Sequence, residues 1–193
     1  KKIKWINNLN ELNNFPCIFI ANEFFDAMPI KQFIKKSDQW NERYVKFFSQ
    51  KEPGYLDIPF NIKKLEKKIK FNISTKQNFI EYSPLLIKYL KNITNKIKLN
   101  DGGILIIDYG YIDRKMKNTI QAVYKHKYTD VLKSFGSCDI TYNLSFNLIS
   151  QIIKKLGPFF QSITSQKEFL IKLGILKRAE ILSKNMPFSK KAD

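Results

Sequence analysis

The segment that decides the fold is CIFIANEFFDAMPIKQF, residues 17–33. Its first five residues, 17–21, are apolar, and so short a run favours a strand buried on both faces of a parallel sheet. The run ends at Asn22, Glu23 and Asp26, with two phenylalanines between the acids. In open α/β sheets ligands bind at the carboxyl ends of the strands, which makes this junction a candidate site. The alternative is that Asn22 or Glu23 only begins a short helix and complements its dipole.

A second apolar run predicts a neighbouring strand of the same sheet. Residues 104–107 are all aliphatic and are followed by Asp108 and Tyr109. Between the two runs, an amphipathic helix is predicted to begin at Ser83-Pro84 and to end at residues 100–103, Asn-Asp-Gly-Gly. The order strand, helix, strand is typical of a βαβ unit, whose strands end at one edge of the sheet. Asp108 and Tyr109 are therefore expected beside the acids of the first strand.

The residues between the first strand and the helix are predicted to form a small insertion over about residues 31–80. Residues 31–35 and 43–48 are typical of two short strands joined around residues 37–39, Ser-Asp-Gln. Pro53-Gly54 indicates a turn. The polar, lysine-rich residues 61–78 indicate a surface loop or a frayed helix. Near the start of the chain, before the apolar run at 17–21, residues 4–6 are expected to close a short strand.

Composition restricts the class of protein. The 193 residues are 44% hydrophobic, enough for a core, and no apolar stretch is long enough to cross a membrane. Cys17 and Cys138 lack partners at metal-ligand spacing, and no secretion signal is evident. One soluble, reduced, intracellular domain is expected.

The charge distribution argues against nucleic acid as the main partner. The net charge is +17, but the lysines are scattered in ones and twos, and only three of the 34 basic residues are arginines. Because base readout favours arginine and phosphate binding favours clustered charge, a solvated lysine coat is the expected interpretation.

Seven segments, taken in order, resemble one known family. They are IANEFFDAMPIKQF, ERYVKF, FIEYSPLL, GGILIIDYGY, TIQAVYKHKYTD, GSCDITYNLSF and FLIKLGILKRA. Together they resemble the C-terminal two thirds of the MidA family of S-adenosyl-L-methionine-dependent class I methyltransferases, over nearly the whole chain. The NEFFDA-P segment followed by GG-x-L-x-I-DYG carries most of the specificity.

The resemblance implies a fold, a cofactor and an activity. The fold would be α/β: a partial Rossmann-like class I methyltransferase sheet, mixed parallel with antiparallel C-terminal strands, plus the small β-hairpin insertion. The cofactor would be S-adenosyl-L-methionine. The mitochondrial family member is a protein arginine methyltransferase that assists respiratory complex I assembly. A protein substrate with an arginine acceptor, as in a respiratory complex subunit, is therefore expected, in a bacterial cytoplasm or the mitochondrial matrix.

The resemblance also implies that part of the family's domain is missing. The family carries a glycine-rich cofactor loop before the strand at 17–21, but all seven glycines of this chain follow that strand. The chain is therefore expected to be an N-terminally truncated piece, inactive and without useful cofactor affinity by itself. Residues 2–6 would be unpaired, and the bare strand edge would favour aggregation or a homodimer. Strands near residues 157–164 and in the last dozen residues would complete the sheet.

Methyl transfer to arginine explains why carboxylates would suit this junction. A guanidinium stays protonated, and two unit charges about 4 Å apart repel by roughly 4 kcal/mol at an effective dielectric of about 20. Two carboxylates would remove this repulsion between the guanidinium and the cationic sulfonium. Hydrogen bonds to them would also draw positive charge away from the reacting nitrogen. Glu23 and Asp26 are therefore the predicted catalytic residues.

Other strand-end residues are assigned by the same resemblance. Asn22 and Glu23 would lie near the methionine part of the cofactor. The predicted substrate-binding residues are Phe24, Phe25, Asp108, Tyr109, Asp139 and Thr141. For the two phenylalanines, the alternative is that at least one belongs to the core. No metal ligand is predicted.

Two departures from the family pattern leave alternatives open. Where the family tends to carry His and Asp, this chain has Asn143 and Ser145. One alternative keeps the fold but gives it a small-molecule or other side-chain acceptor. The other is a non-enzymatic assembly or RNA-contacting module with a degenerate site.

Overall fold

The computed structural model describes residues 3–48, 51–133 and 136–184. The chain divides into two compact units, Lys1–Phe159 and Phe160–Asp193. The described strands all belong to the first unit. The second unit contains α4 (Gln166–Lys172) and α5 (Ile175–Ser183). No helix in the described ranges is both long enough and apolar enough to cross a membrane.

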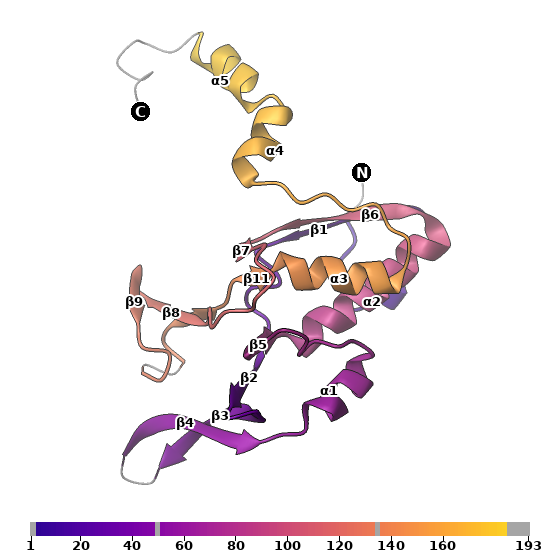
Figure 1. Cartoon of the computed structure of the whole chain (residues 1–193). Coiled ribbons are helices and arrows are strands. Elements are labelled where there is room, and N and C mark those ends of the chain that lie inside the picture. Colours follow the sequence, from indigo (N-terminus) through magenta and orange to yellow (C-terminus); the bar gives the residue numbers. More distant parts are fainter. Residues whose placement is uncertain (1–2, 49–50, 134–135, 185–193) are drawn as a thin grey trace. The chain divides into compact units, whose positions relative to one another are not determined.

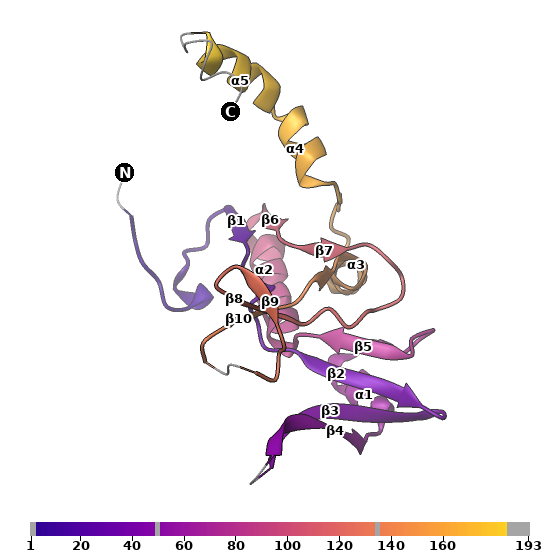
Figure 2. The same cartoon turned by 90° about the vertical axis from the view of Figure 1, so that its left-hand side faces the viewer.

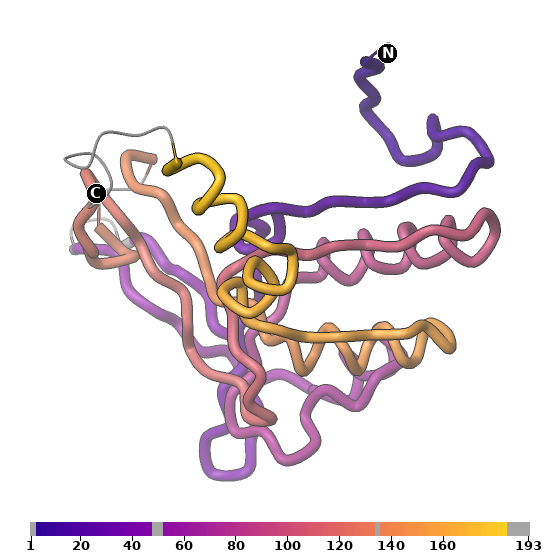
Figure 3. The backbone as a smooth tube through the Cα atoms, turned by 90° about the horizontal axis from the view of Figure 1, so that it is seen from above, coloured from indigo at the N-terminus to yellow at the C-terminus, as the bar shows by residue number. Residues whose placement is uncertain are grey.

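A parallel pair of strands is the centre of the first unit. β1 (Cys17–Asn22) pairs in parallel with β6 (Gly102–Ile107), and the register aligns Asn22 with Ile107. α2 (Pro84–Asn100) makes the crossover, so the predicted βαβ unit is confirmed. Figure 1 shows α2 and α3 (Phe146–Leu156) beneath these strands, and Figure 3 shows the same four elements running alongside one another.

The chain forms α2 because both of its ends are specified locally. The Ser83 side chain accepts the backbone N–H of Leu86 at 3.2 Å, and Pro84 occupies the first helical turn. Beyond the helix, Gly102 has φ 124°, and a Cβ there would lie 2.0 Å from the carbonyl oxygen of Cys17. A glycine is therefore required where β6 begins beside β1.

The insertion is a four-stranded antiparallel sheet, of which only part was predicted. Its order is β4 (Lys51–Pro59), β3 (Gln39–Phe48), β2 (Lys31–Lys36), β5 (Phe79–Tyr82), as Figure 2 shows. The predicted hairpin of residues 31–35 and 43–48 is confirmed as β2 and β3. The strand β5 was not predicted, because four residues after a polar stretch give no periodic signal.

The turn predicted at Pro53-Gly54 is wrong, since both residues lie inside β4. β4 is an edge strand, where a proline without an N–H is tolerated. The register between β3 and β4 also shifts between Lys46 and Phe48, opposite Pro53. The bulge and the edge position together allow the strand to continue.

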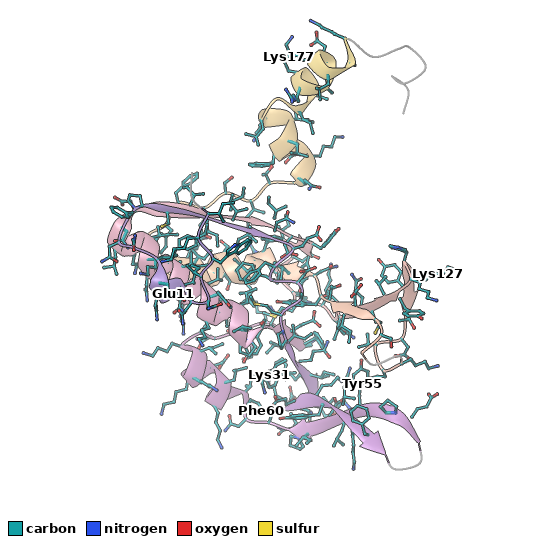
Figure 4. The ribbon with its side chains drawn as sticks, turned by 180° about the vertical axis from the view of Figure 1, so that it is seen from behind. Glu11, Lys31, Tyr55, Phe60, Lys127 and Lys177 are labelled. Carbon is teal, nitrogen blue, oxygen red and sulfur yellow. The ribbon has the colours of Figure 1, made fainter. Side chains whose placement is uncertain are left out.

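The polar residues 61–78 form a defined helix followed by turns. α1 (Ile62–Ile69) is capped by Asn61, whose side chain accepts the N–H of Lys63 at 3.0 Å. Just before it, the ring of Phe60 packs on Phe33 of β2 with centroids 4.9 Å apart. Figure 4 labels Phe60, and also Lys31, which forms an ion pair with the buried Glu42 of β3.

Three predicted strands are absent from the described residues. Residues 4–6 and 157–164 contain no strand, and of the last dozen residues only 182–184 are described, at the end of α5. The sheet of β1 and β6 has two strands and takes none from after Asp139. The strands there pair elsewhere: β10 (Asp139–Thr141) with β8 (Gln121–Tyr124), and β11 (Leu144–Ser145) with β7 (Gly110–Tyr111). β8 also pairs with β9 (Lys127–Thr129).

One hydrophobic core joins the parallel pair to the insertion. The fully buried side chains of Phe25, Phe33, Ile80, Leu90 and Leu144 come from the turn after β1 and from β2, β5, α2 and β11. Leu99, by contrast, is 81% exposed on the same helix as Leu90. The two leucines of α2 therefore differ strongly in burial.

Leu90→Ala should destabilise the protein by about 3 kcal/mol, because it removes buried methyl groups and leaves a cavity. Leu99→Ala makes the same chemical change on the same helix and should shift stability by at most about 0.5 kcal/mol. Urea unfolding of both variants measures the difference. Equal effects would contradict the described packing of α2.

A partly buried ion pair in the insertion predicts an acid-dependent stability. Asp57 of β4 accepts from Arg43 Nε at 2.9 Å and Nη2 at 3.1 Å, and Lys36 Nζ lies 2.9 Å away. The Arg43 hydrogen bond is the largest cause that lowers the pKa of Asp57, to about 2, below the 3.8 of an unperturbed aspartate. Since the folded pKa is the lower one, the stabilisation is complete above pH 4 and is lost as the pH falls through about 2.

Asp57→Asn should therefore cost up to about 2 kcal/mol at pH 7, and its difference from the wild type should vanish near pH 2. Denaturant unfolding across this pH range checks it. Asp38→Asn is a suitable control, because the Asp38 side chain is 94% exposed and its one ion-pair partner among the described residues is Lys35. A pH-independent difference for Asp57→Asn would exclude ionisation as the cause.

Candidate functional site

The candidate site is the turn that follows β1. The parallel ladder extends one residue beyond the strand, since the N–H of Glu23 donates to the carbonyl of Ile107 at 2.9 Å. Glu23 then adopts a left-handed conformation with φ 44°. This conformation costs about 1–2 kcal/mol for a residue that has a Cβ. The chain turns sharply here instead of continuing as a strand.

The carboxylate of Asp108 holds this turn. Its Oδ2 accepts the backbone N–H groups of Phe25 at 3.1 Å and Asp26 at 3.4 Å, and its Oδ1 accepts that of Tyr109 at 2.9 Å. Hydrogen bonds to charged groups contribute about 1.5–3 kcal/mol each, enough to offset the strain at Glu23. The prediction that the acidic ends of the two strands lie together is confirmed.

The electrostatic environment of Asp108 is unfavourable to its charge. Burial is the largest cause that raises the pKa of Asp108, and the neighbouring charge of Asp26 raises it further. The three backbone N–H groups act in the opposite direction but do not cancel the effect. Two carboxylates therefore lie close together at this end of the sheet.

Asp26 and Glu23 lie at different depths. Asp26 is only 6% exposed, and within the described residues its carboxylate accepts no hydrogen bond and forms no ion pair. Its carbonyl accepts the N–H of Tyr142 at 3.2 Å, which ties the turn to the segment after β10. Glu23 is exposed. A carboxylate at so shielded a position and without a cation beside it is an attractive partner for a cationic ligand.

The two phenylalanines of the turn separate into core and surface. Phe25 is fully buried, so it takes the core alternative and is not available as the wall of an acceptor channel. Phe24 is 43% exposed and packs edge-on against Phe25 and against Tyr89 of α2, with centroids 5.2 and 5.3 Å away. Of these two phenylalanines, Phe24 is therefore the one that offers an aromatic surface at this edge.

The other predicted site residues lie outside the turn. Asn22 and Tyr109 are exposed at the ends of β1 and β6. Asp139 and Thr141 lie on β10, where Asp139 pairs with Val123 and Thr141 Oγ1 accepts from Gln121 Nε2 at 3.2 Å. Within the described residues, β10 connects to the turn through the backbone hydrogen bond of Tyr142.

The two positions that depart from the family pattern have local structural roles. The N–H of Asn143 donates to Thr119 Oγ1 at 2.9 Å. The Ser145 side chain caps α3 by accepting the N–H of Leu148 at 3.3 Å. A serine serves this cap as an aspartate would, so the change at Ser145 preserves the helix end.

Sequence reasoning missed a buried polar network next to the turn. Glu81 of β5 is 4% exposed and accepts from Gln32 Nε2 at 2.6 Å, from Thr119 N at 3.1 Å and from Thr119 Oγ1. Burial is the largest cause that raises the pKa of Glu81, and the hydrogen bonds from Thr119 and Gln32 lower it without cancelling the effect. The signal that could have revealed it is an acid between Ile80 and Tyr82 in a short apolar strand.

Tyr142 was also missed. Its ring is buried, and its hydroxyl has no hydrogen-bond partner of good geometry within the described residues. Burial raises the pKa of Tyr142, as do the charges of Asp108, Glu81 and Asp26. Tyr142 also lines a cavity of about 20 Å³ together with Glu81, Ser83 and Ser145, room for about one water molecule. Of the three acids, Glu81 lines this cavity together with Tyr142.

Comparison with known proteins identifies relatives over most of the chain. A family model described as "Putative S-adenosyl-L-methionine-dependent methyltransferase" matches residues 1–163. The chain is 27% identical over 187 residues to the mitochondrial protein arginine methyltransferase NDUFAF7 homolog of Caenorhabditis elegans. This match covers 91% of this chain and 42% of that protein. It is 28% identical to NDUFAF7 of Xenopus tropicalis, covering 92% and 41% respectively. The chain thus spans about two fifths of the length of these relatives.

Solved structures show the same fold. A crystal structure of a protein from Burkholderia thailandensis bound to S-adenosyl-homocysteine matches with a TM-score of 0.73 and 22% identity, over 92% of this chain and 47% of that one. A second, native structure from the same organism matches with a TM-score of 0.72 and 21% identity. The mixed α/β fold expected from the sequence is confirmed. Because the family model covers most of its residues, the chain belongs to the family of S-adenosyl-L-methionine-dependent methyltransferases.

Proposed function

We propose that this protein transfers a methyl group from S-adenosyl-L-methionine to an arginine side chain of a protein substrate. The observation that carries the proposal is Asp26, a residue only 6% exposed, whose carboxylate has no cation or hydrogen-bond donor among the described residues and has Asp108 as a neighbouring charge. Such a pair suits a ligand that brings both positive charge and N–H donors. The names of the relatives, protein arginine methyltransferases, agree with this choice.

The two predicted catalytic carboxylates have different tasks in this proposal. Glu23 is exposed at the rim and would receive the incoming guanidinium, and the more deeply placed Asp26 would accept a second hydrogen bond from it. Together they compensate the repulsion between the guanidinium and a sulfonium. By holding charge on the bound nitrogens, they leave the remaining nitrogen more nucleophilic. Phe24 offers a surface against which the acceptor side chain can lie.

The described residues fit one part of the cofactor. S-adenosyl-L-methionine supplies the electrophilic methyl group, and Asn22 and Glu23 at the end of β1 are the candidates to hold its methionine part. No left-handed glycine lies beside this strand end, since the described glycines with positive φ are Gly102, Gly136 and Gly174. Binding of the adenosine part is therefore assigned to none of the described residues.

The substrate class and the cellular location belong to the same proposal. The relatives are mitochondrial proteins by name, which favours the mitochondrial matrix if the source is eukaryotic. A subunit of a respiratory complex is the protein substrate that the resemblance to the MidA family implies. The scattered lysines remain a solvated coat in this interpretation.

In the complete protein, Glu23→Gln and Asp26→Asn should each lower methyl transfer to an arginine peptide by about a hundredfold, because each removes one preorganised charge. Radiolabelled methyl transfer measures the rate. Calorimetry should find the affinity for S-adenosyl-L-methionine nearly unchanged in Asp26→Asn, because the proposal assigns no cofactor contact to Asp26. Asp38→Asn, an exposed acid on the insertion, is the matched control. Full activity of both site variants, or equal methylation of the corresponding lysine peptide, would reject the guanidinium anchor.

A further inference from the structure

We propose that Asp108 is a positioning residue that sets the orientation of Glu23 and Asp26, a role that rests on the proposed function. Sequence reasoning assigned Asp108 to substrate binding. The geometry favours another task, because its carboxylate makes three hydrogen bonds to backbone N–H groups and its partners include the turn that carries both predicted catalytic acids.

The acceptor capacity of Asp108 is largely used within the chain. A carboxylate has about four lone-pair sites, and Phe25, Asp26 and Tyr109 occupy three of them. Little capacity is left for a guanidinium. Asp26 has the opposite character, since its carboxylate makes no hydrogen bond within the described residues. The two neighbouring acids therefore differ in role: Asp108 holds the backbone, and Asp26 is open to a ligand.

The strained residue shows what Asp108 holds in place. Glu23 has a left-handed φ of 44° between its bond to Ile107 and the two N–H groups that donate to Asp108. Anchors thus lie on both sides of Glu23, and the second anchor comes from a residue 83 positions from Phe25 in the sequence. Without Asp108 nothing described holds the N–H groups of Phe25 and Asp26, and Glu23 is free to leave its conformation.

A double-mutant cycle in the complete protein tests whether Asp108 acts through Glu23. Glu23→Gln alone should lower kcat by about a hundredfold. Asp108→Ala should lower kcat by a similar factor, and the double variant should lose little beyond the worse single variant, because Glu23 is already misplaced. Additive losses would overturn the proposal and leave Asp108 with a structural or independent role.

Amide hydrogen exchange supplies a second readout that does not depend on activity. The N–H groups of Phe25 and Asp26 should be protected in the wild type and should exchange about tenfold faster or more in Asp108→Ala. Asp108→Asn keeps one acceptor oxygen, so the exchange rates of these two amides should lie between those of the wild type and of Asp108→Ala. Asp113→Ala is the matched control, since Asp113 is half exposed and, in the part of the chain that the structure describes, its side chain forms an ion pair with Lys117 alone.

The two readouts separate the possible failures. If Glu23→Gln has no effect on kcat, the proposed function fails. If kcat is also unchanged in Asp108→Ala, the proposal that Asp108 positions the catalytic acids fails as well. If the amides of Phe25 and Asp26 exchange equally in wild type and Asp108→Ala, the positioning role is wrong whatever the kinetics show. If Asp108→Ala does not fold, Asp108→Asn carries both measurements, with smaller expected changes of the same sign.

Discussion

The parallel pairing of β1 with β6 is the constraint on which the candidate site depends. Parallel strands end at the same edge, so the register that aligns Asn22 with Ile107 brings the residues after each strand together. Asp108 can then accept the N–H groups of Phe25 and Asp26. Had the strands been antiparallel, the two acidic ends would lie at opposite edges of the sheet. The acids are neighbours because the two strands run in the same direction. The hydrogen bonds that Asp108 accepts from the turn then fix its conformation.

The strongly patterned elements were predictable from sequence, and the locally ambiguous ones were not. The aliphatic runs of β1 and β6 and the amphipathic α2, with its Ser83 cap, carry signals that do not depend on tertiary context. Pro53 reads as a turn, but an edge position and a bulge make it compatible with β4. Residues 157–164 include Phe159, Phe160 and Ile163, which suit a strand, yet no described strand pairs with them. A segment with strand propensity thus forms a strand only where a neighbouring strand is available for pairing.

The candidate site shows the same division. The sequence places acids directly after the runs that form β1 and β6, and the βαβ order predicts that these strand ends lie together. The direction in which Glu23 turns the chain decides which of the two adjacent phenylalanines faces the core. The left-handed backbone conformation of a glutamate cannot be predicted from the sequence. Glu81 and Tyr142 were missed because their importance comes from partners on other elements, such as Thr119 and Asp26. Polar burial is a property of the assembled fold.

The placement of the whole insertion between β1 and β6 has a consequence for how the chain folds. Contacts such as that of Phe25 with Asp108 join residues 83 positions apart, whereas the hairpin of β2 and β3 needs only neighbouring residues. Contacts between distant residues form slowly, because the loop between them must first be ordered. During synthesis β1 therefore leaves the ribosome well before its partner, and its apolar edge must wait while the insertion folds. This interval is when the nascent chain is most exposed to misassociation.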